Sequence, residues 1–421
     1  MKTSIVILYI LLAVVVFFPA QDIYSENNKI ETLEELIDEA LNNNPSVRQA
    51  YTIWRAAEYR IPQSMSLPDP LARYTFFGES VETRVGPQEY KIGASQKIPF
   101  PVKLALKGKS EARRASILKE KYEAERRRII EQIKFAYYDI FWVDKALSIT
   151  EEQKSIVENL EKVAQKRYEF NIAPLQDVLK AQIEFSKLVD RLVLLKQNRK
   201  SLKSKMVSIL NRPSSVFNDV ESVEPIEFNY KLEQLHSIAS ESKQELLAAK
   251  LDIQRAAYER SLAAFDYLPD VTLGFEYINV GKGYTTQPND GQDAWMGSVA
   301  INVPIWFNRL DANLKEKKSY LEASMKRYDN ISNRVYYEVD DMHFKILAYK
   351  DIISLYKTAL LPQTKQGFEA ARTGYETGKV DFLNWLDSER VLLRTRLAYY
   401  KAIVDYMKSI AYLERIVGTN L

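Results

Sequence analysis

The sequence predicts a mainly α-helical protein with a small β part, in which long coiled-coil helical hairpins occur twice and four β-strands lie between helices. Glycine and proline are scarce, with 13 Gly and 15 Pro among 421 residues. Because an interior proline costs a helix roughly 3 kcal/mol, the proline-free stretch from Val102 to Ala173 favours one continuous helix on the order of 100 Å long. Similar local motifs also return about 200 residues apart, which indicates a duplicated unit.

The N-terminus has the pattern of a secretory signal peptide. Lys2 precedes an apolar run from Ile5 to Phe18, and small and polar residues follow it. As a helix this run covers only about 21 Å, less than the roughly 30 Å hydrocarbon layer, so a cleaved signal is favoured over a retained anchor. We therefore predict a signal peptide over residues 1–20, with cleavage between 20 and 25.

A first structural unit is predicted over residues 26–212. Thr32 followed by Glu35 is the signature of a capping box, which starts an amphipathic helix. Alternation of apolar and polar residues within 71–98 then predicts a β-hairpin. A long helical hairpin completes the unit, and its turn is expected near 171–174, where Asn and Pro interrupt the pattern.

The two arms of this helical hairpin have matching apolar seams. From Val178 to Ile209, mostly apolar residues recur at alternating steps of three and four, which is typical of a coiled coil. A similar seam runs from Trp142 to Val163, so the arms are expected to pair in antiparallel fashion. Arg199 is the exception within the seam, and it would face either a carboxylate of the partner helix or a water-filled lumen.

The same order of parts returns after a linker predicted over 213–235. Leu67-Pro68-Asp69 reappears as Leu268-Pro269-Asp270, and Ile98-Pro99 reappears as Val303-Pro304. A second copy of the unit is therefore predicted over 236–421. Its expected parts are a helix, a β-hairpin over 271–303 and a long helical hairpin whose tip lies near 374–381.

The four strands are candidates for a membrane segment. Each has about nine or ten residues, which is the length a tilted strand needs to cross a bilayer. Four strands leave two open edges, however, and lipid does not tolerate the unpaired backbone groups of an edge. Membrane barrels have at least about eight strands, so several subunits would have to share one barrel. A soluble four-stranded sheet packed on helices is the alternative.

Composition argues against several classes of function. With 59 Lys+Arg against 56 Asp+Glu, the net charge of +3 is too small for a nucleic-acid partner to be expected. Without Cys there is no disulfide, thiolate metal site or lipidated N-terminal cysteine. His236 and His343 lie far apart, so no metal or other cofactor is expected. No phosphate loop, serine elbow or zinc-protease motif is present, so we expect no enzyme.

Taken together, these parts resemble the TolC-type outer-membrane efflux protein family from about Thr32 to Leu421. The most specific motif, Tyr375 to Asp387, is similar to the family's tip sequence and has Gly378 three residues after the tyrosine. Tyr168 to Ala181 matches this motif more loosely, with an Asn in place of the usual Gly. The chain's compact length also looks similar to the family's heavy-metal efflux branch.

The resemblance implies a homotrimer in the outer membrane, in which four strands from each chain form a shared twelve-stranded transmembrane barrel. The helices would continue from it into the periplasm as a tunnel. The implied function is that of an exit channel for substrates that an inner-membrane pump delivers through a periplasmic adaptor, with outer-membrane lipid around the barrel. A periplasmic coiled-coil adaptor or scaffold without a membrane barrel is the alternative. The substrate, the pump and the adaptor stay open.

The resemblance also implies a periplasmic gate and adaptor-docking tips at the ends of the helical hairpins. A ring of Asp387 carboxylates would favour cations, whereas a solvated helix acid is the plain alternative. Asn384 stands where the family has a second carboxylate, so a less acidic gate is expected. The gate candidates are Asp387, Asn384 and Asp177, and the docking candidates are Tyr168, Asn171, Pro174, Tyr375 and Gly378.

Overall fold

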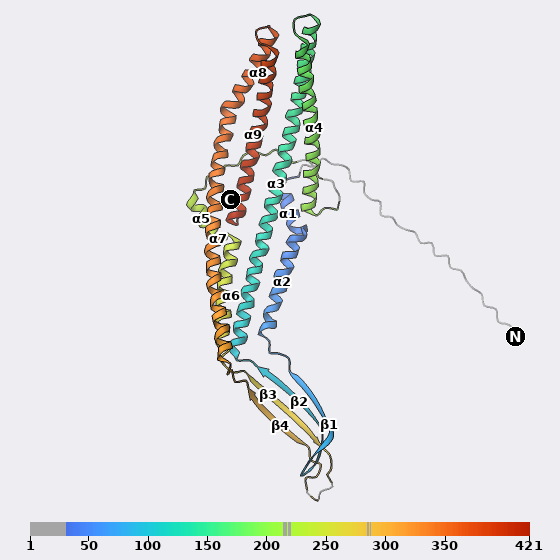
Figure 1. Cartoon of the computed structure of the whole chain (residues 1–421), viewed down its shortest axis with the longest axis vertical. Coiled ribbons are helices and arrows are strands. Elements are labelled where there is room, and N and C mark those ends of the chain that lie inside the picture. Colours follow the sequence, from blue (N-terminus) through green and yellow to red (C-terminus); the bar gives the residue numbers. More distant parts are fainter. Residues whose placement is uncertain (1–30, 214–216, 218–219, 284–285, 287) are drawn as a thin grey trace, which may run out of the picture.

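The computed structural model describes residues 31–213, 217, 220–283, 286 and 288–421. The predicted signal peptide lies outside this part of the chain. The molecule is long and narrow, with four strands at one end and the turns of two helical hairpins at the other (Figure 1). A mainly helical fold with a small antiparallel sheet was predicted from the sequence, and the structure confirms it.

The first repeat begins with two short helices rather than the single helix predicted. Thr32 and Glu35 form the expected capping box, in which each side chain accepts a hydrogen bond from the other residue's backbone N–H. Asn44 ends the first helix and caps the next by accepting a hydrogen bond from the Ser46 N–H at 2.9 Å. The elements are α1 (Leu33–Asn43), α2 (Pro45–Met65), β1 (Leu71–Thr83), β2 (Gly86–Ile98), α3 (Pro101–Glu169) and α4 (Leu175–Leu210).

The second repeat has the same order, with two boundaries that differ from the expected ones. Its first helix starts at Leu232, inside the predicted 213–235 linker. Gly374 lies within a helix that ends at Glu376, so the second tip turn is shorter than 374–381. The elements are α5 (Leu232–Ser242), α6 (Gln244–Phe265), β3 (Val271–Val280), β4 (Ala294–Ile301), α7 (Phe307–Leu355), the π-helix η1 (Tyr356–Leu360), α8 (Leu361–Glu376) and α9 (Phe382–Val417).

Pro362 explains the π-helical turn in the second hairpin. It lies at the second position of α8, directly after η1, in an otherwise continuous helical arm. A proline provides no N–H and its ring clashes with the preceding turn, so a locally wider turn lets the arm continue past it. The first hairpin has no such proline between Pro101 and Pro174, and α3 is accordingly uninterrupted over 69 residues.

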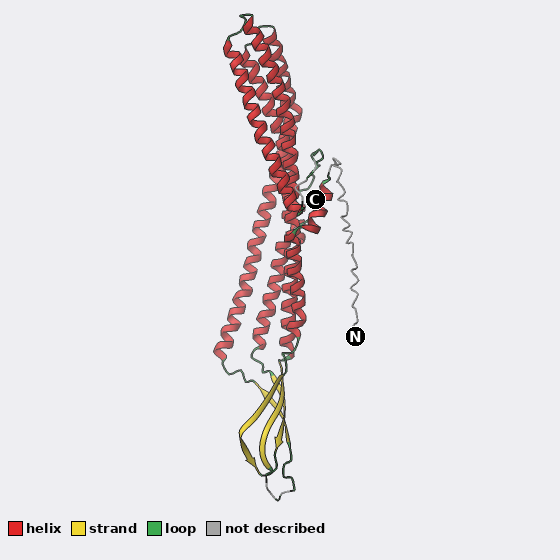
Figure 2. Cartoon of the chain, turned by 90° about the vertical axis from the view of Figure 1, so that its right-hand side faces the viewer, coloured by secondary structure: helices red, strands yellow, loops and turns green. Residues whose placement is uncertain are grey.

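The four strands form one antiparallel sheet in the order β1-β2-β3-β4. A row of apolar residues crosses one face of it, with Tyr74 opposite Ile92, Ile92 opposite Tyr277, and Tyr277 opposite Trp295. This face is open in the single chain, since Tyr74 is 65% and Trp295 is 73% exposed. The two edges of the sheet belong to β1 and β4. Figure 2 shows the strands as a single layer beyond the ends of the helices.

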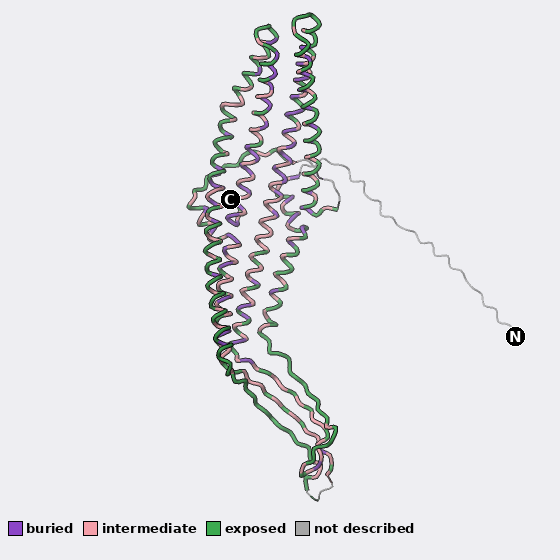
Figure 3. The backbone as a smooth tube through the Cα atoms, in the orientation of Figure 1, coloured by how far each residue is buried: buried purple, intermediate pink, exposed green. Residues whose placement is uncertain are grey.

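The helices are held together by two apolar clusters. One lies at mid-length, where α1, α5 and the C-terminal half of α9 pack on α3, α4 and α7. The other runs along the seams of α3, α4, α8 and α9 towards the tips. Figure 3 shows this pattern as buried stretches along facing helices and exposed strands at the other end.

The structure shows which group the seam residue Arg199 contacts. Its Nε donates a hydrogen bond to Oδ1 of Asp144 on α3, at 2.6 Å. Of the two alternatives that the sequence left open, the partner carboxylate is therefore the one found. Because both side chains are about 30% exposed, the pair adds little net stability and serves mainly to satisfy a charge beside the seam.

Within the described ranges, none of the helices combines the length and the apolar character that crossing a membrane requires.

Candidate functional site

The two hairpin turns lie next to each other at the end of the molecule farthest from the strands (Figure 1). They are built alike. Asn171 and Gly378 adopt left-handed backbone with φ of 54° and 77°. Directly after each of them, the next N–H bonds back five residues, from Ile172 to the Arg167 carbonyl and from Lys379 to the Gly374 carbonyl, both at 2.8 Å. This is a Schellman-type helix ending, so the loosely matching first tip has the same geometry as the second.

The two tyrosines at the tips have different surroundings. Tyr168 is 43% exposed, whereas Tyr375 is only 3% exposed. The Arg167 guanidinium lies 4.6 Å from the ring centroid of Tyr375 and also donates a hydrogen bond to its carbonyl. Phe382 and Trp385 contact the same ring from α9. Tyr375 is therefore not part of the exposed surface of the second tip, whereas Tyr168 is part of that of the first.

The gate candidates divide between the two hairpins. Asn384 and Asp387 are exposed on the first turns of α9, while Asp177 is half-buried at the start of α4. Burial raises the pKa of Asp177, and the nearby Asp381 carboxylate raises it further, while Lys180 and Arg167 act in the opposite direction. Asp381 itself caps α9 by accepting a hydrogen bond from the Asn384 N–H at 2.8 Å. The tip thus brings two carboxylates and the Arg167 guanidinium together.

A buried carboxylate was not among the residues predicted from the sequence. Glu389 on α9 is 0% exposed, and neither of its carboxylate oxygens has a hydrogen-bond partner among the described residues. Burial, reinforced by the carboxylate of Glu184 on α4, raises the pKa of Glu389 to about 7, against the attraction of Arg390. Glu184 is also buried and pairs with Arg390. Leu386 precedes Glu389 by three residues, which is a coiled-coil step, and this spacing could have predicted from the sequence that Glu389 faces the seam.

Gln153 on α3 is a second buried polar residue, and it lies beside the apolar cluster that runs towards the tips. It is 0% exposed, and its side-chain oxygen and nitrogen both lack hydrogen-bond partners in the described part of the chain. Four residues before and after it, Ile149 and Val157 are buried in that cluster. Each of these two buried groups, Glu389 and Gln153, weakens the packing of its own helix, because a buried unpaired polar group costs about 1–3 kcal/mol.

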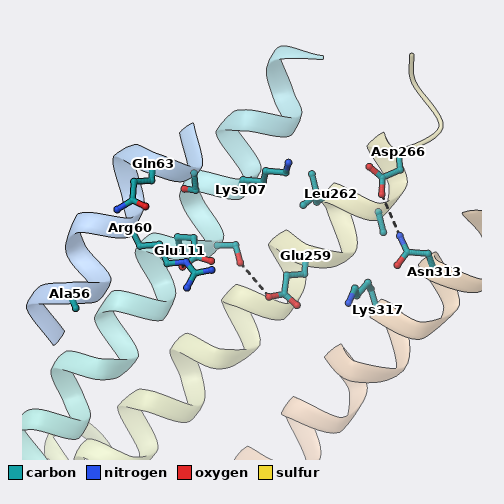
Figure 4. Close-up of a pocket in the computed structure, with 13 residues that line it drawn as sticks. Ala56, Arg60, Gln63, Lys107, Glu111, Glu259, Leu262, Asp266, Asn313 and Lys317 are labelled. Carbon is teal, nitrogen blue, oxygen red and sulfur yellow. Dashed lines mark hydrogen bonds and ion pairs between the residues drawn. The ribbon is translucent and has the colours of Figure 1, made fainter. Parts of the chain in front are cut away.

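A groove lies at the opposite end of the helices, close to the strands. Figure 4 shows it between α2, α3, α6 and α7, with a volume of about 840 Å³. Charges of both signs line it, and the hydrogen bonds within it are long, at 3.4 Å from Ser110 to Glu259 and 3.3 Å from Asn313 to Asp266. Such a surface suits a hydrated wall better than a specific ligand pocket. Its charged residues are Arg60, Lys107, Glu111, Glu259, Asp266 and Lys317.

The histidines are engaged with protein groups. His236 Nε2 lies 2.7 Å from Asp340 Oδ1, and His343 Nε2 lies 3.2 Å from the Tyr230 carbonyl oxygen. Over residues 31–213, 217, 220–283, 286 and 288–421, no three His, Asp or Glu side chains come close enough together to hold a metal ion.

Comparisons with known proteins extend over both repeats. A family model described as "Outer membrane efflux protein" matches residues 36–212 and 235–419. The outer membrane protein TolC of Vibrio cholerae is 22% identical over 401 residues, covering 92% of this chain and 91% of TolC. The cobalt-zinc-cadmium resistance protein CzcC of Cupriavidus metallidurans is 27% identical over 157 residues, covering 36% of this chain and 34% of CzcC.

Solved structures share the fold along almost the whole chain. The channel protein CusC superposes with a TM-score of 0.80 at 17% identity, covering 93% of both chains. The outer membrane protein VceC of Vibrio cholerae superposes with a TM-score of 0.77 at 18% identity, covering 92% of this chain and 96% of VceC. The likeness therefore includes both strand pairs as well as both helical hairpins.

Proposed function

The chain belongs to the outer membrane efflux protein family, and we propose that it works as a homotrimer in which three copies share one passive channel. As a member of this family it is an outer-membrane exit channel of a tripartite efflux system, and it extends into the periplasm. A periplasmic adaptor without a membrane segment fits less well, because the family match includes both strand pairs.

One observation carries the proposal: a sheet with two open edges is joined end to end to helices on the order of 100 Å long. A four-stranded sheet with an exposed apolar face and unpaired edges cannot cross lipid by itself. Three copies supply twelve strands, which is enough to close a barrel. The helices of three copies then continue the same conduit across much of the periplasm.

We place the gate at the hairpin tips. The contact of Arg167 with Tyr375 ties the first hairpin to the second and favours the closed tip. Three exposed Asp387 carboxylates within about 6 Å of one another would repel by roughly 0.7 kcal/mol per pair at water-like dielectric. This repulsion favours opening, and the negative ring favours cations at the entrance. The carboxylate of Asp177 interacts electrostatically with that of Asp381 at the tip, and it adds to the negative potential there.

A periplasmic adaptor would dock on the exposed residues of the two turns. Tyr168, Asn171 and Pro174 are exposed in the first turn, and Gly378 is exposed in the second. Tyr375 is buried beneath the second turn and stabilises its conformation, and it does not contact the adaptor in this proposal. The two turns present similar backbone but different side chains, so two adaptor copies would meet related but unequal surfaces.

Substrate choice belongs to the pump in this proposal. CzcC carries cobalt, zinc and cadmium in its name, and its similarity covers 36% of this chain, so we propose metal ions as the first substrate class to test. A deletion strain is exposed to a panel of metal salts and drugs, and the wild-type gene is returned on a plasmid. Sensitivity that the plasmid reverses supports an efflux role, and an unchanged panel together with a soluble monomer in the periplasm would contradict it.

Topology can be tested separately with two inserted epitope tags. A tag after Arg84, in the turn between β1 and β2, should be labelled on intact cells because that turn lies beyond the membrane strands. A tag after Ile172, in the first tip turn, should be labelled only after the outer membrane is permeabilised. Labelling of both tags on intact cells would contradict the proposed orientation.

A further inference from the structure

The joint between sheet and helices is locked by one carboxylate. Oδ1 of Asp270, directly before β3, accepts hydrogen bonds from the Phe100 N–H at 3.1 Å and from Lys103 Nζ at 2.8 Å. Lys103 Nζ also donates to the Leu268 carbonyl at 2.8 Å. The side chains of Asp270 and Lys103 are only 12% and 8% exposed. The start of a second-repeat strand thereby holds the N-terminus of α3, a first-repeat helix.

The repeat places an equivalent acidic residue and an equivalent basic residue where β1 and α7 begin, but these two side chains do not meet in the single chain. Leu67-Pro68-Asp69 precedes β1 as Leu268-Pro269-Asp270 precedes β3. Arg309 is the third residue of α7, as Lys103 is the third residue of α3. Asp69 and Arg309 are both exposed, and neither side chain forms an ion pair within the described ranges. They flank β1 and β4, the two outer strands, which lie about 14 Å apart across the sheet.

A barrel shared by three copies places β4 of one copy beside β1 of the next. We propose that at this seam the partner subunit's Asp69 caps α7 and forms an ion pair with Arg309. This inference rests on the proposed trimer and specifies its seam. The partner subunit's Asp69 would repeat the role of Asp270 at the N-terminus of α7, where the N–H to be capped belongs to Trp306, one residue beyond the position that the Val303-Pro304 alignment gives for Phe100. Trp306 precedes α7 as Phe100 precedes α3, and its N–H has no hydrogen-bond partner among the described residues.

The repeat also determines the register of this seam. The pair Ala72 and Ala94 in the first hairpin corresponds to the pair Leu273 and Val299 in the second, once the Leu-Pro-Asp motifs are aligned. Within the chain, Ala94 of β2 lies opposite Phe275 of β3. Transferring that pair to the seam replaces Ala94 by Val299 and replaces Phe275 by Tyr74 of the partner subunit. Val299 therefore lies opposite the partner subunit's Tyr74.

Side-chain sizes support this register, although they were not used to derive it. Two residues along in either direction, Gly297 faces the partner subunit's Phe76, and Ile301 faces the partner subunit's Ala72. The partner subunit's Phe76 thus meets a glycine, and the partner subunit's Ala72 leaves room for Ile301. A slip of two residues would place Ile301 against the partner subunit's Tyr74 instead and crowd the seam. On the other face, Ser298 meets the partner subunit's Thr75, a pair that can share a hydrogen bond.

Disulfide trapping tests the register, because the chain has no Cys of its own. Opposed residues of antiparallel strands have Cα atoms about 4.5–5.5 Å apart, within the range a disulfide spans. The double variant Tyr74→Cys and Val299→Cys should therefore yield dimers and trimers in outer-membrane fractions on non-reducing denaturing gels. Reductant should return them to monomer. Each single variant should remain monomeric on the same gels.

Two matched variants make the result decisive. Phe76→Cys with Val299→Cys moves one partner by two residues, to about 7–8 Å, and should not cross-link. Leu273→Cys with Val299→Cys should close within one chain and give no ladder. Cross-linking of the displaced pair and not of the Tyr74 pair would overturn the register even where the trimer and efflux persist. If the wild-type chain, which has no Cys, forms no trimer and supports no efflux, the proposed function itself is wrong.

Charge reversal tests the ion pair. Asp69→Lys and Arg309→Glu should each lower the temperature at which the trimer dissociates in SDS, and the double variant should regain most of the loss. Lys103→Glu with Asp270→Lys reverses the pair within the chain and provides the comparison. Failure of the double variant at the seam to regain stability, while the single variants lose it, would overturn the ion pair.

Discussion

Neutralising Glu389 should stabilise the protein at alkaline pH and reduce the pH dependence of its stability. Burial among apolar seam residues, with Glu184 nearby, raises its pKa from 4.5 to about 7. Because the folded state holds this proton more tightly than the unfolded chain, the contribution of Glu389 to stability is greatest below pH 4.5 and is lost as the pH rises to about 7. Since one pKa unit corresponds to 1.36 kcal/mol, the loss amounts to about 3 kcal/mol per chain.

The assay is thermal unfolding followed by far-ultraviolet circular dichroism in detergent, at pH 5 and at pH 8. Wild type should melt at a lower temperature at pH 8, and Glu389→Gln should narrow the difference by melting higher at pH 8. Glu389→Leu avoids leaving an unpaired amide in the seam and should show the same trend. Glu169→Gln neutralises an exposed carboxylate near the tip and should leave the pH dependence unchanged. Equal pH dependence in wild type and both Glu389 variants would refute the reasoning.

Three further changes test the tip and the joint. Arg167→Ala removes the contact and the hydrogen bond to Tyr375, so single channels in planar bilayers should stay open longer. Asp387→Asn removes one carboxylate per chain and should reduce the preference for cations, measured as the reversal potential in a salt gradient. Lys103→Met leaves the nearly buried Asp270 with fewer partners and should cost about 1–3 kcal/mol of stability, measured by thermal unfolding.

Matched controls separate these effects from general damage. Lys166→Ala removes an exposed charge beside Arg167 and should leave gating unchanged. Glu376→Gln removes an exposed acid near the tip that pairs with Arg372, and it should alter ion preference less than Asp387→Asn. Lys97 is 53% exposed and is the more hydrated partner of Asp270, so Lys97→Met should cost less than Lys103→Met. Equal effects of control and test variants would contradict the assigned roles.

Features that depend on neighbouring residues in the chain could be predicted closely. The capping box at Thr32, the proline-free run of α3 and the glycine at the second tip each act within a few residues of themselves. Period-two alternation likewise located both strand pairs. The division of the first helical segment of each repeat into two helices was harder to predict, because Asn44 and Lys243 interrupt the helical pattern for only one residue each.

Features that depend on which faces meet were decided only by the tertiary structure. Tyr168 and Tyr375 occupy equivalent places in the two tip motifs, yet Arg167 and the α9 aromatics cover Tyr375 and leave Tyr168 exposed. The sequence also placed Arg199 in the seam without telling which group it meets, and packing of α4 on α3 provides Asp144.

By itself, the sequence determined that this is a duplicated chain of strand pairs and long coiled hairpins, since helix length, turn chemistry and seam spacing are local properties. Only the tertiary structure decided that Asp270 locks one joint while Asp69 is left exposed at the other. The physical reason is that β2 and β3 are neighbours within one chain, whereas β1 and β4 are open edges. Among the described residues of a single chain, the same local motif therefore has its partner in one repeat and lacks it in the other.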